Sequence, residues 1–278
     1  MLAGLLALGL AGCSTVKLAY NNLPELSYWW LDGYLDFDDS QAPRVRAELE
    51  RLLAWHRRNE LPRWIELLQQ AQQLAPGDAT AAQACALNDA VRDRLLVLAE
   101  QAEPASAELA LTLAPAQLQH LQRKLESRNA EFADDWLDAT PEAIQTRRYK
   151  RWLDWAETLY GTLDETQRAA LRAMVAKPPF DPPMAEAQHR PRQAVLLAGL
   201  ASLQDGASAA KARQVLKDYV QMVAQPAPGG WREHREALQL EGCRNFAALH
   251  ASTNAQQRAH ARQRLLGYEQ DLRALRSP

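Results

Sequence analysis

Apolar residues recur every three or four positions along most of the chain, which is the period of an amphipathic helix. Val45, Leu49 and Leu52 form one such stripe, and a second stripe runs through residues 81–102. No alternation of apolar and polar residues is long enough to predict a strand. The pattern therefore predicts an all-α fold of about eight to ten elongated or bundled antiparallel helices, with no significant sheet.

Prolines mark where the predicted helices begin and end. Pro62 lies within the first long stripe and kinks or restarts its helix. Three more prolines occupy positions where a helix can begin, namely Pro104, Pro115 and Pro141. Thr140 is well suited to cap the helix that begins after it. The proline-rich segment 177–183 is the longest interior break, and it lies inside what we predict as a single helical domain over residues 38–278.

The same short pattern opens four of the predicted helices. Its copies end in Gln41, Gln117, Gln167 and Gln257. In three copies an Asp or Asn stands three residues before the glutamine, where its side chain can accept hydrogen bonds from amides of the first helical turn. The fourth and eighth residues after each glutamine are apolar, so each copy starts an amphipathic helix. Any capped amphipathic helix shares much of this pattern, and the unequal spacing of the copies excludes a solenoid.

The first twelve residues are an uncharged apolar run that leads to Cys13. A bilayer-spanning helix needs about 20 apolar residues, so this run is too short to span and has the length of the apolar part of a signal peptide. The run lacks the Lys or Arg that normally opens a signal peptide, which leaves open a translation start upstream of Met1. The alternative is an ordinary buried N-terminal segment that contains a cysteine.

The sequence Leu10-Ala11-Gly12-Cys13 resembles the processing site of a bacterial lipoprotein. This resemblance implies that residues 1–12 are a removed signal peptide and that Cys13 carries diacylglycerol and a further acyl chain such as palmitate. Ser14 stands where an inner-membrane lipoprotein usually has Asp, which implies the outer membrane as the location, with the body in the periplasm.

Residues 13–37 then form a lipid-anchored lead-in that is rich in aromatic residues. Tyr28, Trp29 and Trp30 lie close to the anchor in sequence, and tryptophan and tyrosine favour the headgroup region of a bilayer. These side chains either rest on the membrane surface or fold back into the core. The anchor makes the membrane one predicted partner of the protein.

The overall charge is nearly neutral, since 32 Lys and Arg face 34 Asp and Glu for a net charge of −2. This balance gives no electrostatic reason to expect nucleic acid as a partner.

Hydrolase and phosphate-loop motifs are absent from the sequence, so we predict no catalytic residues and no cofactor. His56 and Glu60 lie one helical turn apart without an evident third ligand, so a surface pair is expected there and no metal site. An aspartate cluster around Trp136 has the composition of a glycan site, although a solvated helix end is the simpler interpretation.

Cys85 and Cys243 are the remaining thiols once Cys13 is lipidated. An even number of thiols in an oxidising compartment favours a disulfide. Such a bridge requires Cα atoms within about 7 Å, so it predicts that the C-terminal helices pack back onto the N-terminal ones. The alternative is two buried small apolar residues in separate helices.

The densest basic run is a candidate patch for anionic ligands such as lipid phosphates or an acidic partner. It comprises Arg147, Arg148, Lys150 and Arg151. The alternative is a plain solvated helix face, with Trp152 and Trp155 in the core.

Two family resemblances follow from particular segments. Residues 18–21, 30–36 and 54–63 resemble an uncharacterised family of bacterial lipoproteins that is known only as a domain of unknown function. Residues 163–167, Leu-Asp-Glu-Thr-Gln, are more loosely similar to the motif of LTXXQ-type periplasmic proteins, which are small helical envelope-stress proteins with chaperone-like activity.

These observations lead us to expect a non-enzymatic, lipid-anchored periplasmic protein that binds protein clients, with chaperone-like action. An envelope lipid- or lipopolysaccharide-binding module for assembly is the alternative, and an enzyme acting on cell-wall glycan is a distant third.

Overall fold

The computed structural model describes residues 11–176, 180–227 and 229–276. Within these ranges it contains twelve α-helices, a short π-helix and no strand, which confirms the all-α prediction. In chain order the elements are α1 (Ala11–Asn21), α2 (Leu23–Leu35), α3 (Gln41–Asn59), α4 (Leu61–Leu74), α5 (Ala81–Ala110), α6 (Pro115–Phe132), η1 (Ala133–Leu137), α7 (Pro141–Tyr160), α8 (Glu165–Ala176), α9 (Pro182–Ala201), α10 (Ala209–Ala224), α11 (Gly230–Ala251) and α12 (Ala255–Arg276). The predicted number of eight to ten helices is too low. The lead-in itself forms α1 and α2, and the chain restarts a helix at Leu61, just before Pro62.

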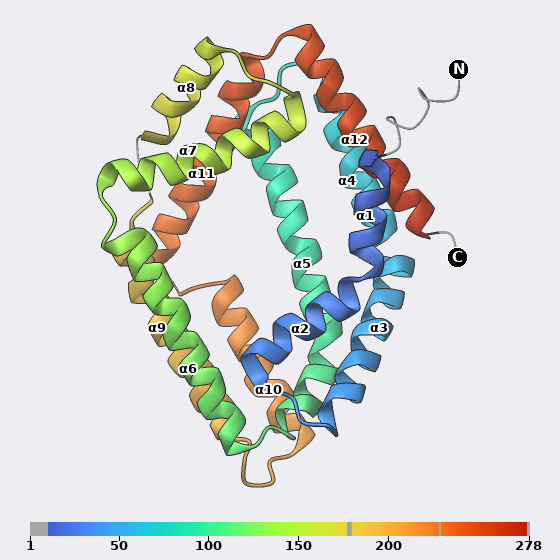
Figure 1. Cartoon of the computed structure of the whole chain (residues 1–278), viewed down its shortest axis with the longest axis vertical. Coiled ribbons are helices and arrows are strands. Elements are labelled where there is room, and N and C mark those ends of the chain that lie inside the picture. Colours follow the sequence, from blue (N-terminus) through green and yellow to red (C-terminus); the bar gives the residue numbers. More distant parts are fainter. Residues whose placement is uncertain (1–10, 177–179, 228, 277–278) are drawn as a thin grey trace, which may run out of the picture.

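Two groups of turns between helices lie at opposite ends of an elongated molecule (Figure 1). The α2–α3, α5–α6 and α9–α10 turns meet at one end, which we call the α5–α6 end. The α4–α5, α7–α8 and α11–α12 turns meet at the other, which we call the α7–α8 end. Helix α5 runs between the two ends, and its 30 residues span about 45 Å.

Helices from the two halves of the sequence pack against each other. Helix α12 lies along α4 and also contacts α1, while α10 and α11 both pack on α5. Elements on either side of the proline-rich segment 177–183 are therefore joined through shared helical interfaces. Residues 177–179 of that segment, like the apolar residues 1–10, lie outside the described residues.

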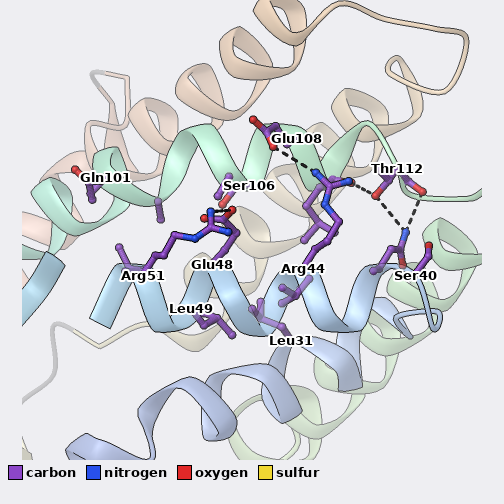
Figure 2. Close-up of a pocket in the computed structure, with 16 residues that line it drawn as sticks. Leu31, Ser40, Arg44, Glu48, Leu49, Arg51, Gln101, Ser106, Glu108 and Thr112 are labelled. Carbon is purple, nitrogen blue, oxygen red and sulfur yellow. Dashed lines mark hydrogen bonds and ion pairs between the residues drawn. The ribbon is translucent and has the colours of Figure 1, made fainter. Parts of the chain in front are cut away.

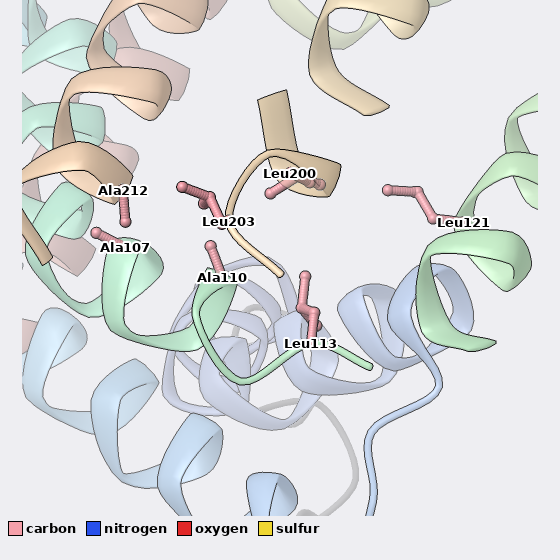
Figure 3. Close-up of a cluster of buried hydrophobic side chains, with 7 residues drawn as sticks. All are labelled: Ala107, Ala110, Leu113, Leu121, Leu200, Leu203 and Ala212. Carbon is pink, nitrogen blue, oxygen red and sulfur yellow. The ribbon is translucent and has the colours of Figure 1, made fainter. Parts of the chain in front are cut away.

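Each end has its own cluster of buried apolar side chains. The cluster at the α5–α6 end is formed by α5, α6, α9, α10 and their turns (Figure 3). Its buried members are Ala107, Ala110, Leu113, Leu121, Leu200, Leu203 and Ala212. The cluster at the α7–α8 end surrounds Tyr160, Leu163 and Leu171, and Ala261 of α12 belongs to it. Burying a leucine side chain stabilises a fold by about 1.5–3 kcal/mol, so each cluster holds its own set of turns together.

The four glutamines of the repeated pattern meet in two pairs, one at each end of the molecule. At the α5–α6 end, Gln41 and Gln117 exchange side-chain hydrogen bonds of 2.7 and 3.1 Å. At the α7–α8 end, Gln167 and Gln257 do the same at 2.8 and 2.9 Å. Each pair therefore ties together two turns that are far apart in sequence.

Each glutamine also accepts a hydrogen bond from the backbone amide three residues before it. Where an Asp or Asn stands at that earlier position, its side-chain oxygen accepts a hydrogen bond from the backbone N–H of the glutamine in return. The two bonds together complete a capping box. The predicted caps Asp38, Asp164 and Asn254 are thus confirmed. The sequence did not indicate that the same glutamines also bind one another.

The prolines give a mixed result. Pro115 and Pro141 begin helices as predicted, and the Thr140 hydroxyl accepts from the amide of Ala143 at 3.3 Å. Pro104 does not begin a helix, because it lies inside α5, which continues to Ala110. Pro104 is exposed, whereas its neighbour Glu103 is buried and pairs with Arg213 of α10 at 2.9 Å. Packing on the inner face of α5 therefore outweighs the loss of one helical hydrogen bond.

Candidate functional site

A groove between α3 and α5 is the first candidate binding site (Figure 2). Its volume is about 290 Å³, and we call it the α3–α5 groove. Its apolar lining comes from three helices and comprises Leu31, Val45, Leu49, Leu52, Ala102, Ala105 and Leu109. The alanines of α5 leave room between the two helices that larger residues would fill. The groove therefore offers an apolar floor that the protein itself does not cover.

The rim of the α3–α5 groove is polar and balanced in charge. Arg44 of α3 reaches across to Glu108 of α5 at 3.4 Å, and Arg51 pairs with Glu48 on α3 (Figure 2). All but Glu48 of these four side chains are well exposed, so the pairs add little to stability. Two positive and two negative groups surround the apolar floor. This arrangement suits an amphipathic partner that carries both positively and negatively charged side chains.

Sequence reasoning identified one wall of this groove and missed the other. The stripe of Val45, Leu49 and Leu52 predicts the apolar face of α3 that forms the first wall. The second wall lies on α5 from Gln101 to Leu109, a stretch that the predicted stripe over residues 81–102 covers only at its start. The helical spacing of Ala102, Ala105 and Leu109 was the signal that could have revealed it.

Large exposed apolar side chains gather on α1 and α2. They are Leu18, Leu23, Leu26, Trp29 and Trp30. Trp29 and Trp30 are 63% and 62% exposed, whereas Tyr28 is buried beneath Arg46, whose Cζ atom lies 3.4 Å from the ring centroid. These three adjacent aromatic residues are therefore divided: Tyr28 packs into the core, and Trp29 and Trp30 face outward. The side chain of Cys13 lies outside what the structure describes, and the backbone there is part of α1.

The structure disperses the predicted basic patch. Arg148 is largely buried and donates two hydrogen bonds to Glu241 of α11, at 2.9 and 3.0 Å. Arg147 pairs with Asp135 at 3.0 Å, and Arg151 lies 5.2 Å from the ring centroid of Trp136. Lys150 is exposed. Arg148 therefore serves to join α7 to α11, and the four cations do not form one free surface.

Cys85 of α5 and Cys243 of α11 form a disulfide in this structure, with Cα atoms 5.3 Å apart. The two residues are 158 positions apart in sequence, so the bridge fastens the second half of the chain to the first. Cys243 is buried, which limits the access of external thiols to its sulfur.

His56 and His250 take structural positions. His56 Nδ1 lies 2.8 Å from the hydroxyl of Tyr20, while Glu60 is buried 3.6 Å from Arg94, so the two do not share a ligand. His250 Nδ1 lies 2.8 Å from the hydroxyl of Tyr160, and its Nε2 lies 2.7 Å from the carbonyl oxygen of Gly77. Burial raises the pKa of Tyr20 to about 12 and that of Tyr160 further still.

The described residues contain no group of three or more His, Cys, Asp or Glu side chains arranged to hold a metal ion. Asp134 and Asp135 lie in the first turn of the π-helix η1 and Asp138 directly follows it, while Trp136 packs edge-on against Phe180 with ring centroids 5.0 Å apart. The indole is therefore part of the interior and does not offer a face on which a sugar ring could stack. No helix in the described ranges combines the length and apolar character needed to cross a membrane.

Comparison with known proteins adds one finding. The model of a family of unknown function, DUF6279, matches residues 33–225, which is more than half of the chain. The chain therefore belongs to that family, as the resemblance to an uncharacterised family predicted. No curated protein and no solved structure matches.

Proposed function

We propose that this member of a family of unknown function is a lipid-anchored, non-enzymatic binding protein of the bacterial cell envelope, with its body in the periplasm. Its partner is the apolar face of a protein segment, which it holds in the α3–α5 groove. The observation that carries this proposal is the groove itself, an apolar floor between two helices with a charge-balanced rim. A client helix lying between α3 and α5 would complete a three-helix arrangement and remove that floor from water.

The α1–α2 surface supports the membrane location. Leucine and tryptophan side chains are exposed there within twenty residues of Cys13, the predicted site of lipid attachment. Tryptophan favours the headgroup region, and a lipid chain together with a second apolar contact anchors a protein more firmly than one signal does. Substitution of Cys13 by Ser should therefore abolish labelling with palmitate and leave an unprocessed precursor. Palmitate incorporation into that variant would contradict the anchor.

The groove is tested by filling it. Ser106 is exposed and lines the groove, so Ser106→Trp should occupy the apolar floor while leaving the core of the protein unchanged. The assay measures whether the purified full chain, in a mild detergent, suppresses aggregation of a model client. We expect the wild type to suppress aggregation at molar excess and Ser106→Trp to lose most of this effect.

Ser127→Trp is the matched control, because Ser127 is an exposed serine on α6 that does not line the groove. It should retain the activity of the wild type, and melting curves should show that both variants fold. If the wild type leaves client aggregation unchanged, or if both tryptophan variants lose the effect equally, the groove is not a client site.

A further inference from the structure

A second groove follows the seam between α5 and α11. On α5 its lining includes Ala84, Asn88 and Arg92, which are spaced four residues apart and so share one helix face. On α11 the lining residues recur every three or four positions between Arg232 and Phe246. Two adjoining cavities lie along this face, of about 540 and 290 Å³, and Gln239 lines both. We call the whole feature the seam groove.

The larger cavity of the seam groove is apolar and aromatic. Trp152 and Trp155 of α7 and Phe246 of α11 line it, beside the disulfide at Cys243. Gly242 also lines it, and a Cβ atom built there meets no other atom within 4 Å. A glycine inside a helix costs about 1 kcal/mol relative to alanine, and no close packing at this position requires one. The missing side chain keeps this end of the groove open.

The smaller cavity of the seam groove is cationic. Arg92, Arg232 and Arg235 line it against a single lining carboxylate, Glu236. Arg92 forms a long ion pair with Asp89, with nitrogen and oxygen 3.5 Å apart, and Asp89 also accepts a hydrogen bond from Gln239. The two α11 arginines are positioned by backbone carbonyls instead: Arg232 donates to the oxygen of Pro226 and Arg235 to that of Val223, at 2.8 and 2.9 Å.

A further arginine adds to this positive charge from the neighbouring helix α9. Arg192 lies 5.3 Å from the ring centroid of Trp231, and burial together with the charge of Arg235 lowers the pKa of its guanidinium. Among the described residues, no carboxylate forms an ion pair with Arg192, Arg232 or Arg235. Arg192 and Arg235 thus place like charges close together, and Glu236 is the one carboxylate among the described lining residues of this cavity, a situation that a bound anion would relieve.

We propose that the seam groove binds an amphiphile with a phosphate headgroup, of the phospholipid class, whose phosphate lies among Arg92, Arg232 and Arg235 and whose acyl chains enter the aromatic cavity. Arginine is suited to this role because its planar fork donates paired hydrogen bonds to phosphate oxygens. A phospholipid has a charged head directly joined to apolar tails, as the cationic cavity directly adjoins the apolar one. This site is separate from the α3–α5 groove and does not depend on it.

The experiment compares three probes with the purified full chain in a neutral, phosphate-free detergent. They are phosphatidylglycerol, a diacylglycerol with the same two chains, and glycerol phosphate. Native mass spectrometry counts the bound molecules, and titration gives the relative affinities. We expect one phosphatidylglycerol per protein, bound at least about ten-fold more tightly than either of the other two probes, because only it satisfies both cavities.

Two independent variants test the two ends of the site. Arg232→Gln/Arg235→Gln should weaken phosphatidylglycerol binding to the level of diacylglycerol. Gly242→Leu should block the acyl chains while leaving the helix intact, because space is available for the new side chain. Matched controls are Arg123→Gln/Arg262→Gln, which removes two exposed arginines outside the groove, and Gly267→Leu, which adds a leucine at another open glycine in α12.

Each outcome is decisive for the seam groove. Equal binding of diacylglycerol would show that no phosphate is recognised, and equal binding of glycerol phosphate would show a phosphate site without a place for chains. Either result overturns the proposal, as does phosphatidylglycerol binding that survives both Gly242→Leu and the double arginine variant. Ser106→Trp must leave lipid binding unchanged, so that failure of the α3–α5 groove and failure of the seam groove remain distinguishable.

Discussion

The two ends of the molecule share one structural feature, a pair of glutamines that we call a joint, and they differ in what surrounds that pair. At both ends a reciprocal pair of glutamines ties two distant turns together. At the α7–α8 end the joint is reinforced by buried side chains, since Tyr160 and His250 form a chain of polar contacts that reaches Gly77. At the α5–α6 end Gln41 also lines the α3–α5 groove, so one side of that joint borders a cavity.

The same repeated motif therefore has two roles: one glutamine pair stabilises the fold, and the other borders the proposed binding site. Neither Gln167 nor Gln257 lines any of the grooves described above, whereas Gln41 lines the α3–α5 groove and its pair holds two helices apart at a fixed spacing there. The α7–α8 end and the nearby disulfide therefore hold the frame together, and the α5–α6 end presents the proposed client site. This difference should be measurable as a difference in the stability of the two ends.

The largest effect is expected from the disulfide. Closing a loop of 158 residues stabilises a fold by about 4–5 kcal/mol in the chain-entropy model. Replacing both Cys85 and Cys243 by Ala should therefore lower the free energy of unfolding by about that amount, as measured by urea denaturation. Reduction of the wild type should give the same midpoint as the double variant. Two titratable thiols at these positions in unreduced, denatured protein would contradict the bridge.

The glutamine pairs should differ in strength between the two ends. Gln167→Ala leaves the amide of Gln257 without its partner in a closed interior, which should cost about 3 kcal/mol. Gln41→Ala removes one partner of Gln117, whose Nε2 atom also donates to the carbonyl oxygens of Leu35 and Asp36. Water in the adjoining groove can replace part of the lost hydrogen bonding as well, so about 2 kcal/mol is expected. Urea unfolding of both variants measures the difference. Equal losses would show that the two joints are equally enclosed, and a larger loss for Gln41→Ala would reverse the comparison.

Much of this arrangement could be predicted from the sequence, because helix formation is governed by local patterns. The apolar period predicted the all-α fold, and the Asp and Asn caps placed the starts of α8 and α12 correctly and that of α3 within about two residues. The pairing of the four glutamines could not be predicted, because capping and pairing require the same residue types at the same positions. Which turns meet in space depends on packing between distant helices, such as α12 on α4.

The candidate sites were less accessible to sequence reasoning. A groove arises where two helices fail to fill the space between them, and Ala102 or Gly242 looks the same in sequence whether it faces a neighbour or a cavity. The basic run at 147–151 was conspicuous because its cations are adjacent in the chain. Arg92, Arg232 and Arg235 converge only after folding, and their cluster has no local signature.

The buried polar chain at the α7–α8 end gives a smaller effect. Tyr160→Phe removes the hydroxyl that pairs with His250, and both side chains are only 2% exposed, so about 1–2 kcal/mol should be lost. Tyr20→Phe removes the equivalent contact with His56 at the α1–α3 interface, which is only partly buried, and should cost less than Tyr160→Phe. Thermal unfolding of the two variants makes the comparison. A larger loss for Tyr20→Phe would reverse the assignment of the α7–α8 end as the better supported region.

The smallest expected effect is a dependence of stability on pH that originates at His56. Burial lowers the pKa of His56 below its ordinary value of 6.5, so the unfolded chain takes up a proton at a higher pH than the folded protein does. The contribution of His56 to stability is therefore fully present above about pH 6.5 and is lost as the pH falls through the lower folded pKa. Urea unfolding between pH 5 and pH 7 should show a shallower pH dependence for His56→Gln than for the wild type, whereas the exposed control His260→Gln should keep the wild-type slope. An unchanged slope in His56→Gln would place the pH dependence elsewhere, for example at His189, whose pKa is also lowered by burial.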